Sequence, residues 1–216
     1  MKSFRIFPRF TPLTIAYAAM LIAMSAVLYA FLTFNLNIGG GIIVKKLGFG
    51  SIPIMLSGML FGPVVGGIVG GLSDILQYLI NPVKAGGYLP VFTLTAILIG
   101  VIPSLFYLWE KPGRPHAVLA FFKVLLAVVV TMVVCSFFLN TLWFFLIIKP
   151  DYMAQLLTGN LSAPAQALLI TRILGESISI PVYSILLHTL YRYRRVYISP
   201  RMEQHMVRDR QSKQPA

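Results

Sequence analysis

One acidic residue, Asp74, lies inside the long apolar run of residues 47–80. A carboxylate in an apolar membrane helix is costly and usually marks a functional site. Gln77 and Asn81 follow at +3 and +7, which places them on the helical face of Asp74. This face suits a heteroaromatic ring, because a carboxylate accepts two parallel N–H bonds and amides both donate and accept. The alternative is a structural carboxylate that is satisfied by helix N-termini or by Arg172.

A second pair of charges, Arg172 and Glu176, lies four residues apart in the apolar run of residues 164–191. Exposed ion pairs at this spacing contribute only about 0.3–0.5 kcal/mol, which is a poor reason to keep two charges in a membrane. Two interpretations stay open. The pair lowers its own cost of burial as an intrahelical ion pair, or Arg172 binds a substrate carboxylate.

Other polar candidates lie near the expected outer ends of the helices. Lys45, Lys46 and Lys84 fall in outer loops, against the usual orientation rule, so they either attract an anion or are solvated loop charges. Trp143, which follows Asn140 in the motif LNTLW, either anchors the helix at the membrane interface or stacks on a flat ligand. We therefore predict one outward-facing substrate-binding site that contains Asp74, Gln77, Asn81, Lys45, Lys84, Tyr88, Asn140, Trp143, Arg172 and Glu176.

The composition indicates an integral membrane protein. Of 216 residues, 57% are hydrophobic and 11% are charged, whereas soluble domains carry about 25% charged residues. The net charge of +12 resides in short flanks between apolar runs, which favours membrane topology over nucleic-acid binding as its origin. The single cysteine and three scattered histidines support neither a disulfide framework nor a metal site. We expect no cofactor and no metal.

Apolar runs of membrane-spanning length position these residues. As one helix, residues 47–80 would extend for about 50 Å, which exceeds the hydrocarbon thickness of a membrane. Gly62 and Pro63 provide a natural break, because glycine permits a turn and proline begins a helix well. The shorter half is then either shielded by neighbouring helices or stops partway. We expect helices at 11–34, 49–61, 63–80, 88–109, 117–148 and 164–191.

The distribution of basic residues sets the topology. Both flanks of the apolar region are basic, and short cytoplasmic segments are enriched in Lys and Arg, so the number of spans is even. The first run is too long for a signal peptide and is interpreted as a retained span. The sequence thus predicts an all-α membrane protein, a compact bundle of six transmembrane helices with both termini cytoplasmic. Residues 1–195 form one domain, and residues 196–216 form a basic cytoplasmic tail.

Small residues are regularly spaced on two of the expected helices. Ala16, Ala19, Ala23, Ala26 and Ala30 form one stripe on the first helix. Such a stripe permits close helix approach, either within this protein or at a docking face for a partner subunit. Gly62, Gly66 and Gly70 form a similar ladder, for which we favour packing within this protein.

No phosphate-binding GxxxxGK[ST] motif is present in the sequence, and no paired catalytic set stands out. The chain is therefore not expected to be an enzyme. If the predicted outer site serves import of its substrate, the energy must come from other subunits.

The chain resembles the folate family of S components, the substrate-binding membrane subunits of energy-coupling factor (ECF) transporters. The resemblance is carried by the alanine-rich first helix, FGSIPIMLSGMLFGPVVGGIVGGLSDILQYLINP at 49–82, GGYLPVFTLTAILIG at 86–100 and LNTLW at 139–143. It implies six helices, an outer vitamin site capped by loops one and three, a membrane scaffold subunit and two cytoplasmic ATPase subunits. It also implies that the alanine stripe meets the scaffold and that the protein topples in the membrane to deliver its substrate.

We accordingly expect a multi-pass protein of the bacterial cell membrane that binds folate, membrane lipid and the scaffold, and no nucleic acid. Three alternatives stay open. The chain is an S component for a different vitamin or related small molecule, a stand-alone secondary transporter, or an intramembrane enzyme or assembly factor that depends on Asp74 or Glu176.

Overall fold

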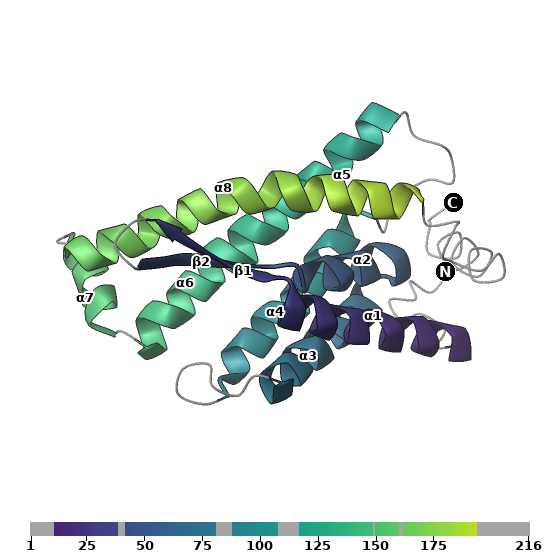
Figure 1. The fold of residues 1–216 in the computed structure, drawn as a ribbon, viewed down its shortest axis with the longest axis horizontal. Helices are drawn as coiled ribbons and strands as arrows, with labels where there is room; N and C mark the ends of the chain where they lie inside the picture. Colours follow the sequence, from purple (N-terminus) through teal and green to yellow (C-terminus); the bar gives the residue numbers. More distant parts are fainter. Residues whose placement is uncertain are drawn as a thin grey trace, which may run out of the picture.

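A computed structural model describes residues 11–38, 42–80, 88–107, 117–148, 150–159 and 162–193. The described part is predominantly helical, as expected from the sequence, with one two-stranded hairpin (Figure 1). The elements in chain order are α1 (Pro12–Phe31), β1 (Thr33–Ile38), β2 (Ile42–Gly48), α2 (Ser51–Phe61), α3 (Pro63–Ile80), α4 (Pro90–Leu105), α5 (Ala117–Thr131), η1 (Met132–Leu139), α6 (Asn140–Trp143), η2 (Phe144–Ile148), α7 (Pro150–Thr158) and α8 (Ala163–Arg192).

Four helical segments in the described part are long and apolar enough to cross a membrane: Pro12–Phe31, Pro63–Ile80, Val118–Ile147 and Ala165–Arg192. Two further apolar helices, α2 and α4, are shorter. The expected membrane residence agrees with this pattern, because helices satisfy their own backbone hydrogen bonds in lipid.

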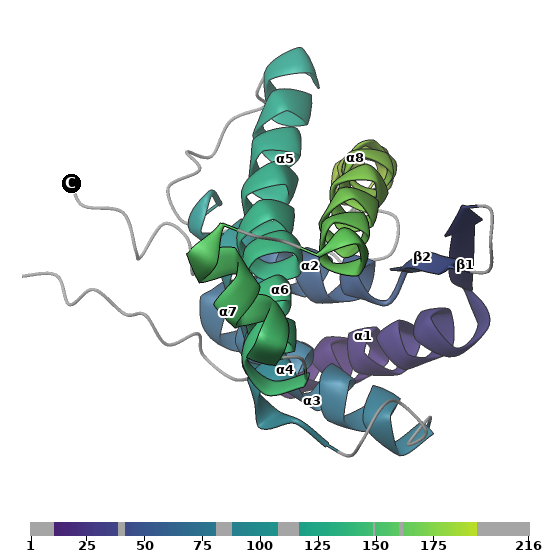
Figure 2. The same ribbon diagram turned by 90° about the vertical axis from the view of Figure 1, so that its left-hand side faces the viewer.

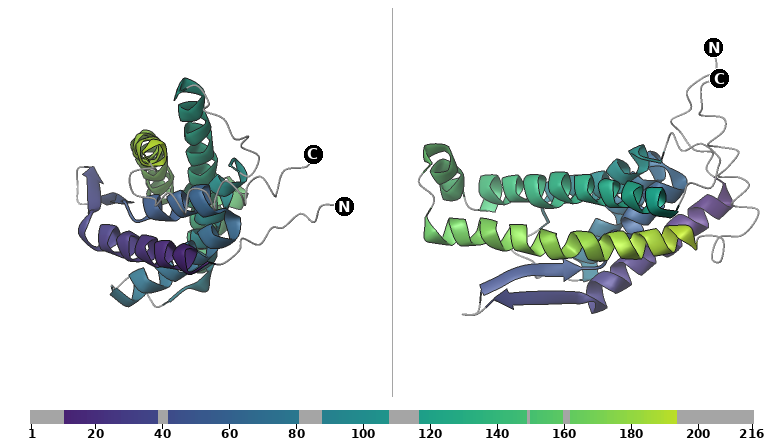
Figure 3. Two further views of the ribbon diagram at one scale, coloured as in Figure 1. Left: turned by 90° about the vertical axis from the view of Figure 1, so that its right-hand side faces the viewer. Right: turned by 90° about the horizontal axis from the view of Figure 1, so that it is seen from above.

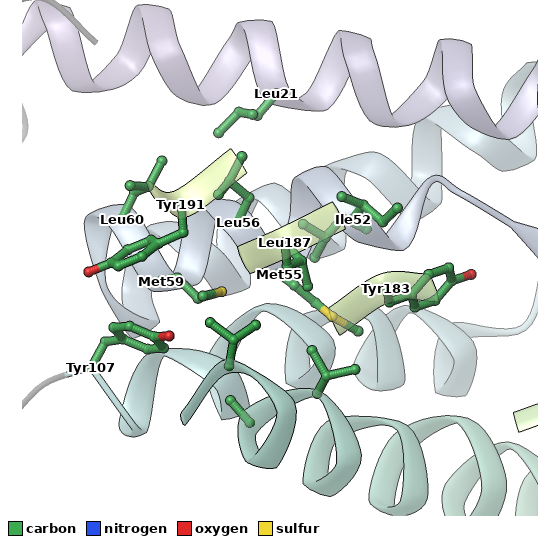
Figure 4. Packing of buried hydrophobic residues seen from close by; sticks show 14 of the residues in the cluster. Leu21, Ile52, Met55, Leu56, Met59, Leu60, Tyr107, Tyr183, Leu187 and Tyr191 are labelled. Atoms are coloured by element: carbon green, nitrogen blue, oxygen red, sulfur yellow. The ribbon is translucent and has the colours of Figure 1, made fainter. Parts of the chain in front are cut away.

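Helix α2 can be shorter than the membrane thickness because neighbouring helices shield it from lipid. Every residue from Ile52 to Phe61 is buried, and Met55 is 0% exposed. Figure 4 shows Met55, Leu56 and Met59 between α1 and side chains of other helices, including Leu187 and Tyr183 of α8. A helix that is apolar on all sides belongs in the interior of a bundle, so α2 needs no lipid-facing side of full membrane length.

Glycines bring α2, α3 and α4 into backbone contact. A Cβ at Gly58 would lie 1.9 Å from the carbonyl oxygen of Gly100, and a Cβ at Gly100 would lie 2.0 Å from that of Gly66. Farther along α3, a Cβ at Gly70 would lie 2.2 Å from the Ala96 carbonyl oxygen. Gly66 and Gly70 thus pack within this protein as predicted. Gly62 acts differently, since its φ of 93° forms the turn between α2 and α3.

The helix ends separate into two groups along the long axis of the molecule. The first residues of α1 and α5 and the last residues of α8 lie at the right-hand end in Figure 1 and in the right panel of Figure 3. Helix α7 lies at the opposite end in both views, and β1 ends and β2 begins on that side as well. Figure 2, seen from this second end, places the hairpin between α1 and α8.

Three local features differ from the sequence-based expectation. The first helix ends at Phe31 instead of continuing to residue 34, and the expected loop forms an antiparallel hairpin in which Leu36 pairs with Lys45. The hairpin is attached to α8, because the Tyr183 hydroxyl donates to the Gly48 carbonyl oxygen at 2.8 Å. The expected outer loop after residue 148 contains α7, and the long helix before it contains the π-helical segments η1 and η2.

Candidate binding site

The predicted site residues that the structure describes fall into two groups instead of one. Asp74 and Gln77 lie on α3 and Tyr88 precedes α4, whereas the remaining candidates lie on α6 and α8. Helices α3 and α8 lie on opposite sides of α2 in Figures 1 and 2, and α2 packs against both. The convergence of all these residues on one ligand stays a prediction.

Asp74 is hydrogen-bonded to α4. The Thr93 hydroxyl donates to Asp74 Oδ2 at 2.7 Å, and the Tyr88 hydroxyl shares a hydrogen bond with the same Thr93 oxygen. The rings of Tyr78 and Tyr88 lie 5.2 Å apart between centroids. The structure thus brings Asp74 and Tyr88 together through Thr93, a residue that the sequence analysis did not identify.

Gln77 forms its hydrogen bond to α1, whereas Asp74 forms its own to α4. Its Nε2 donates to the hydroxyl of Ser25 on α1 at 3.1 Å, and this hydroxyl donates to the Gly50 carbonyl oxygen at 2.7 Å. Ser25 is 0% exposed. The helical face shared by Asp74 and Gln77 is therefore divided between α4 and α1.

Arg172 and Glu176 of α8 each form a hydrogen bond to the preceding long helix. Arg172 Nη1 donates to Thr141 Oγ1 at 3.1 Å, and its guanidinium carbon lies 5.5 Å from the centre of the Phe144 ring. Glu176, which is 7% exposed, accepts a short hydrogen bond from the Ser136 hydroxyl. Each charge thus has its own interhelical hydrogen bond, so an ion pair between them is not required to explain their presence.

Asn140 and Trp143 carry polar atoms that lack protein partners. Within the part of the chain that the structure describes, the buried Asn140 Oδ1 and Trp143 Nε1 have no hydrogen-bond partner. Leaving such a group unsatisfied costs about 1–3 kcal/mol, so each requires an explanation. Residues three apart share a helical face, so the acceptor and the donor lie on the same side of α6. A bound ligand with complementary groups would satisfy both.

We name the residues Asn140, Trp143, Arg172 and Glu176 the α6–α8 site. Its chemistry combines a guanidinium for an anionic group, an indole ring and N–H, and an amide oxygen for a donor. Among the described residues, no cluster of His, Cys, Asp or Glu could hold a metal ion.

The remaining candidates stay predictions. Lys45 and Lys46 belong to β2, where only the backbone is described, and Asn81 and Lys84 lie outside the described residues. On α1, the structure separates the alanines of the predicted stripe. Ala26 is 3% exposed, whereas Ala16, Ala19, Ala23 and Ala30 are exposed.

The sequence analysis missed four hydroxyl residues: Ser25, Thr93, Ser136 and Thr141. Uncharged hydroxyls are common in apolar helices because they can bond to their own backbone, so residue type alone carries no signal. Ser136 and Thr141 are five residues apart, which is not a spacing that aligns residues on an α-helix. A search for polar residues at the five-residue spacing of a π-helix could have found this pair.

Comparisons with known protein sequences identify the family of this chain. Residues 13–191 match the family described as "ECF transporter, substrate-specific component". The folate transporter FolT of Clostridium novyi (strain NT) is 33% identical over 176 residues, which cover 82% of this chain and 86% of the relative.

Two solved structures are similar in fold. The crystal structure of FolT bound with folic acid has 29% sequence identity and a TM-score of 0.61, covering 84% of this chain and 93% of that one. The S component of a bacterial ECF transporter has 23% identity and a TM-score of 0.53, covering 84% and 97%, and it supports the fold alone.

Proposed function

The chain belongs to the substrate-specific (S) components of ECF transporters, and from this premise we propose that it captures folate at the outer face of the bacterial cell membrane. The family is a transporter component and not a catalytic enzyme. Folate is supported by the FolT relative and by the similarity to FolT bound with folic acid.

The ligand binds in the α6–α8 site. The observation that carries this proposal is the pair of buried atoms, Asn140 Oδ1 and Trp143 Nε1, that lack hydrogen-bond partners among the described residues. They lie on the same short helix as Thr141, which bonds to Arg172. A pterin ring offers N–H donors, acceptors and a flat surface for Trp143. The glutamate carboxylates of folate suit the fork of the Arg172 guanidinium.

The membrane domain consists of six helical passes within residues 1–195: α1, α2, α3, α4, the continuous helix from α5 to η2, and α8. The basic flanks place both termini in the cytoplasm, with the tail at 196–216. The first residues of α1 and α5 and the last residues of α8 lie at the same end of the molecule in Figure 1, which supports this topology. Helix α7, at the opposite end, then lies on the outer side of the membrane. The hairpin and the α7 segment belong to loops one and three of the expected topology, and we propose that they cap the site from the outer side.

The loaded protein docks on a membrane scaffold subunit, and two cytoplasmic ATPase subunits supply the energy. The exposed alanines of α1 are the proposed contact, because small side chains permit close approach of a partner helix. The prediction that Asp74, Gln77 and Asn81 also contact the ligand remains a separate hypothesis.

The test measures the binding of folic acid to the purified protein by isothermal titration calorimetry and by tryptophan fluorescence. We expect saturable binding of folic acid and none of thiamine, riboflavin or biotin. Trp143→Phe keeps a ring but removes the N–H donor, and we expect weaker binding with the fold intact. Binding of another vitamin in place of folic acid would overturn the substrate assignment. Folate uptake in cells that lack the ECF scaffold and ATPases would instead favour a stand-alone transporter.

A further inference from the structure

The long helix that carries part of the α6–α8 site changes its hydrogen-bond register. Segments η1 and η2 are π-helical, and the backbone N–H of Asn140 reaches the carbonyl oxygen of Cys135, five residues earlier. π-helical turns are rare and frequently occur at functional sites. The site residues Asn140 and Trp143, and Thr141 between them, lie between the two π-helical segments.

The π-helical register determines which hydroxyls face α8. In an α-helix of 3.6 residues per turn, Ser136 and Thr141 would be about 140° apart around the axis. Here they both face α8, where Ser136 donates to Glu176 and Thr141 accepts from Arg172. Ser136 and Thr141, five residues apart, thus bond to Glu176 and Arg172, which are four residues apart on α8. Two regular α-helices would not align these pairs, since only the four-residue spacing of the two keeps residues on one face.

We propose that Thr141 and Ser136 are positioning residues that orient Arg172 and Glu176 for the ligand, and that the π-helical register is required for this arrangement. The proposal rests on the function proposed above. It adds two residues that do not themselves need to touch folate.

The geometry around Arg172 explains how Thr141 acts. A guanidinium has five N–H donors in a rigid fork, and Thr141 takes a hydrogen bond from one of its terminal nitrogens. The Phe144 ring, 5.5 Å away, lies within the range of a cation–π contact. These two contacts fix the plane of the guanidinium and leave other donors for a carboxylate.

Ser136 has the corresponding role for Glu176. Its hydroxyl, on η1, holds one carboxylate oxygen of Glu176. Glu176 also interacts electrostatically with Arg172 one turn away, so a carboxylate held by its own donor fixes how Glu176 and an anionic ligand share the guanidinium.

The experiment compares two probes on the purified full-length protein. Folic acid carries the glutamate carboxylates, and pteroic acid lacks the glutamate. Thr141→Val keeps the shape of the side chain but removes the hydroxyl acceptor. We expect folic acid to bind about tenfold more weakly, as for the loss of one oriented hydrogen-bonding group, and pteroic acid to bind within about twofold of the unmodified protein.

Three further variants separate positioning from folding. Thr141→Ser restores the hydroxyl and should restore folic acid affinity. Thr131→Val removes a buried hydroxyl that bonds only within its own helix, to Ala127, and should change neither affinity. Ser136→Ala should weaken folic acid by about threefold, also without affecting pteroic acid. If Thr141→Val does not fold, Thr141→Ala replaces it.

The outcomes are distinguishable. If the unmodified protein does not bind folic acid, the proposed function fails. If it binds and Thr141→Val binds folic acid equally well, only the positioning role is overturned. Equal weakening of folic acid and pteroic acid would also overturn it, because the effect would then not depend on the glutamate carboxylates.

Discussion

Gln77 Nε2 donates a hydrogen bond to Ser25 Oγ at 3.1 Å and thereby joins α3 to α1 across 52 residues of sequence. The same Ser25 hydroxyl donates to the carbonyl oxygen of Gly50, which precedes α2. One buried hydroxyl therefore joins three segments. An amide that is expected from its spacing to bind a ligand thus also has a hydrogen bond within the bundle.

Ser25→Ala should lower the stability of the protein. It removes the donor for the Gly50 carbonyl and the acceptor for Gln77, and buried groups left unsatisfied cost about 1–3 kcal/mol. Thermal unfolding in detergent measures the effect. Ser177→Ala is the matched control, because the exposed Ser177 bonds only to Ile173 of its own helix and its removal should have little effect. Equal melting temperatures for the two variants would contradict this role of Ser25.

Gly58→Ala should abolish folding. The added Cβ would lie 1.9 Å from the Gly100 carbonyl oxygen, and a backbone atom cannot move aside without separating α2 from α4. Size-exclusion chromatography of detergent extracts should show no monodisperse peak. Gly67→Ala is the control, because its Cβ meets only methyl groups of Ile97 and Val101 at 3.3 Å. A well-folded Gly58→Ala protein would be inconsistent with the close packing of these helices.

Arg172→Lys should weaken folic acid binding by about tenfold or more, although it keeps the positive charge. A lysine ammonium is a point charge that cannot form the two parallel hydrogen bonds of a guanidinium with a carboxylate. Calorimetric titration gives the affinity, and pteroic acid is the comparison ligand. An unchanged folic acid affinity would show that Arg172 does not hold the glutamate carboxylates.

Asp74→Asn separates the two polar groups of the predicted site. Asp74 accepts a hydrogen bond from Thr93, which an asparagine carbonyl can also accept. If folate is confined to the α6–α8 site, its affinity should stay within about threefold of the unmodified protein, since asparagine keeps the acceptor for Thr93 and Asp74 lies on another helix. A loss of about a hundredfold, measured by the same titration, would place Asp74 in contact with the ligand.

Ala23→Trp should impair transport but not folate binding. Ala23 is exposed on α1, so the indole does not disturb the core, but it would hold a partner helix away from this face. We expect uptake by cells with the complete ECF module to fall by about tenfold or more. Ile185→Trp, at an exposed position on α8, is the control and should transport normally. Normal uptake by Ala23→Trp would mean that docking uses another face.

Local patterns in the sequence were sufficient for the fold class and the family. Apolar run length and low charge content predicted membrane helices, and the described part of the chain contains them. Family membership, expected from residues 49–82 and the neighbouring motifs, is confirmed. The hairpin was missed because Asn35–Lys46 has loop-like composition, and its attachment to Tyr183 depends on a helix far along the chain.

The sequence by itself determined that this chain resides in a membrane, that it forms apolar helices and that glycines bring α3 close to a neighbour. These properties depend on composition and on spacing within one helix. Only the tertiary structure decided which polar side chains meet. Asp74 pairs with Thr93, Gln77 with Ser25, and Arg172 with Thr141. These partners are set by the rotation and register of packed helices, which here depend on glycine contacts between α2, α3 and α4 and on a π-helical shift in the helix facing α8.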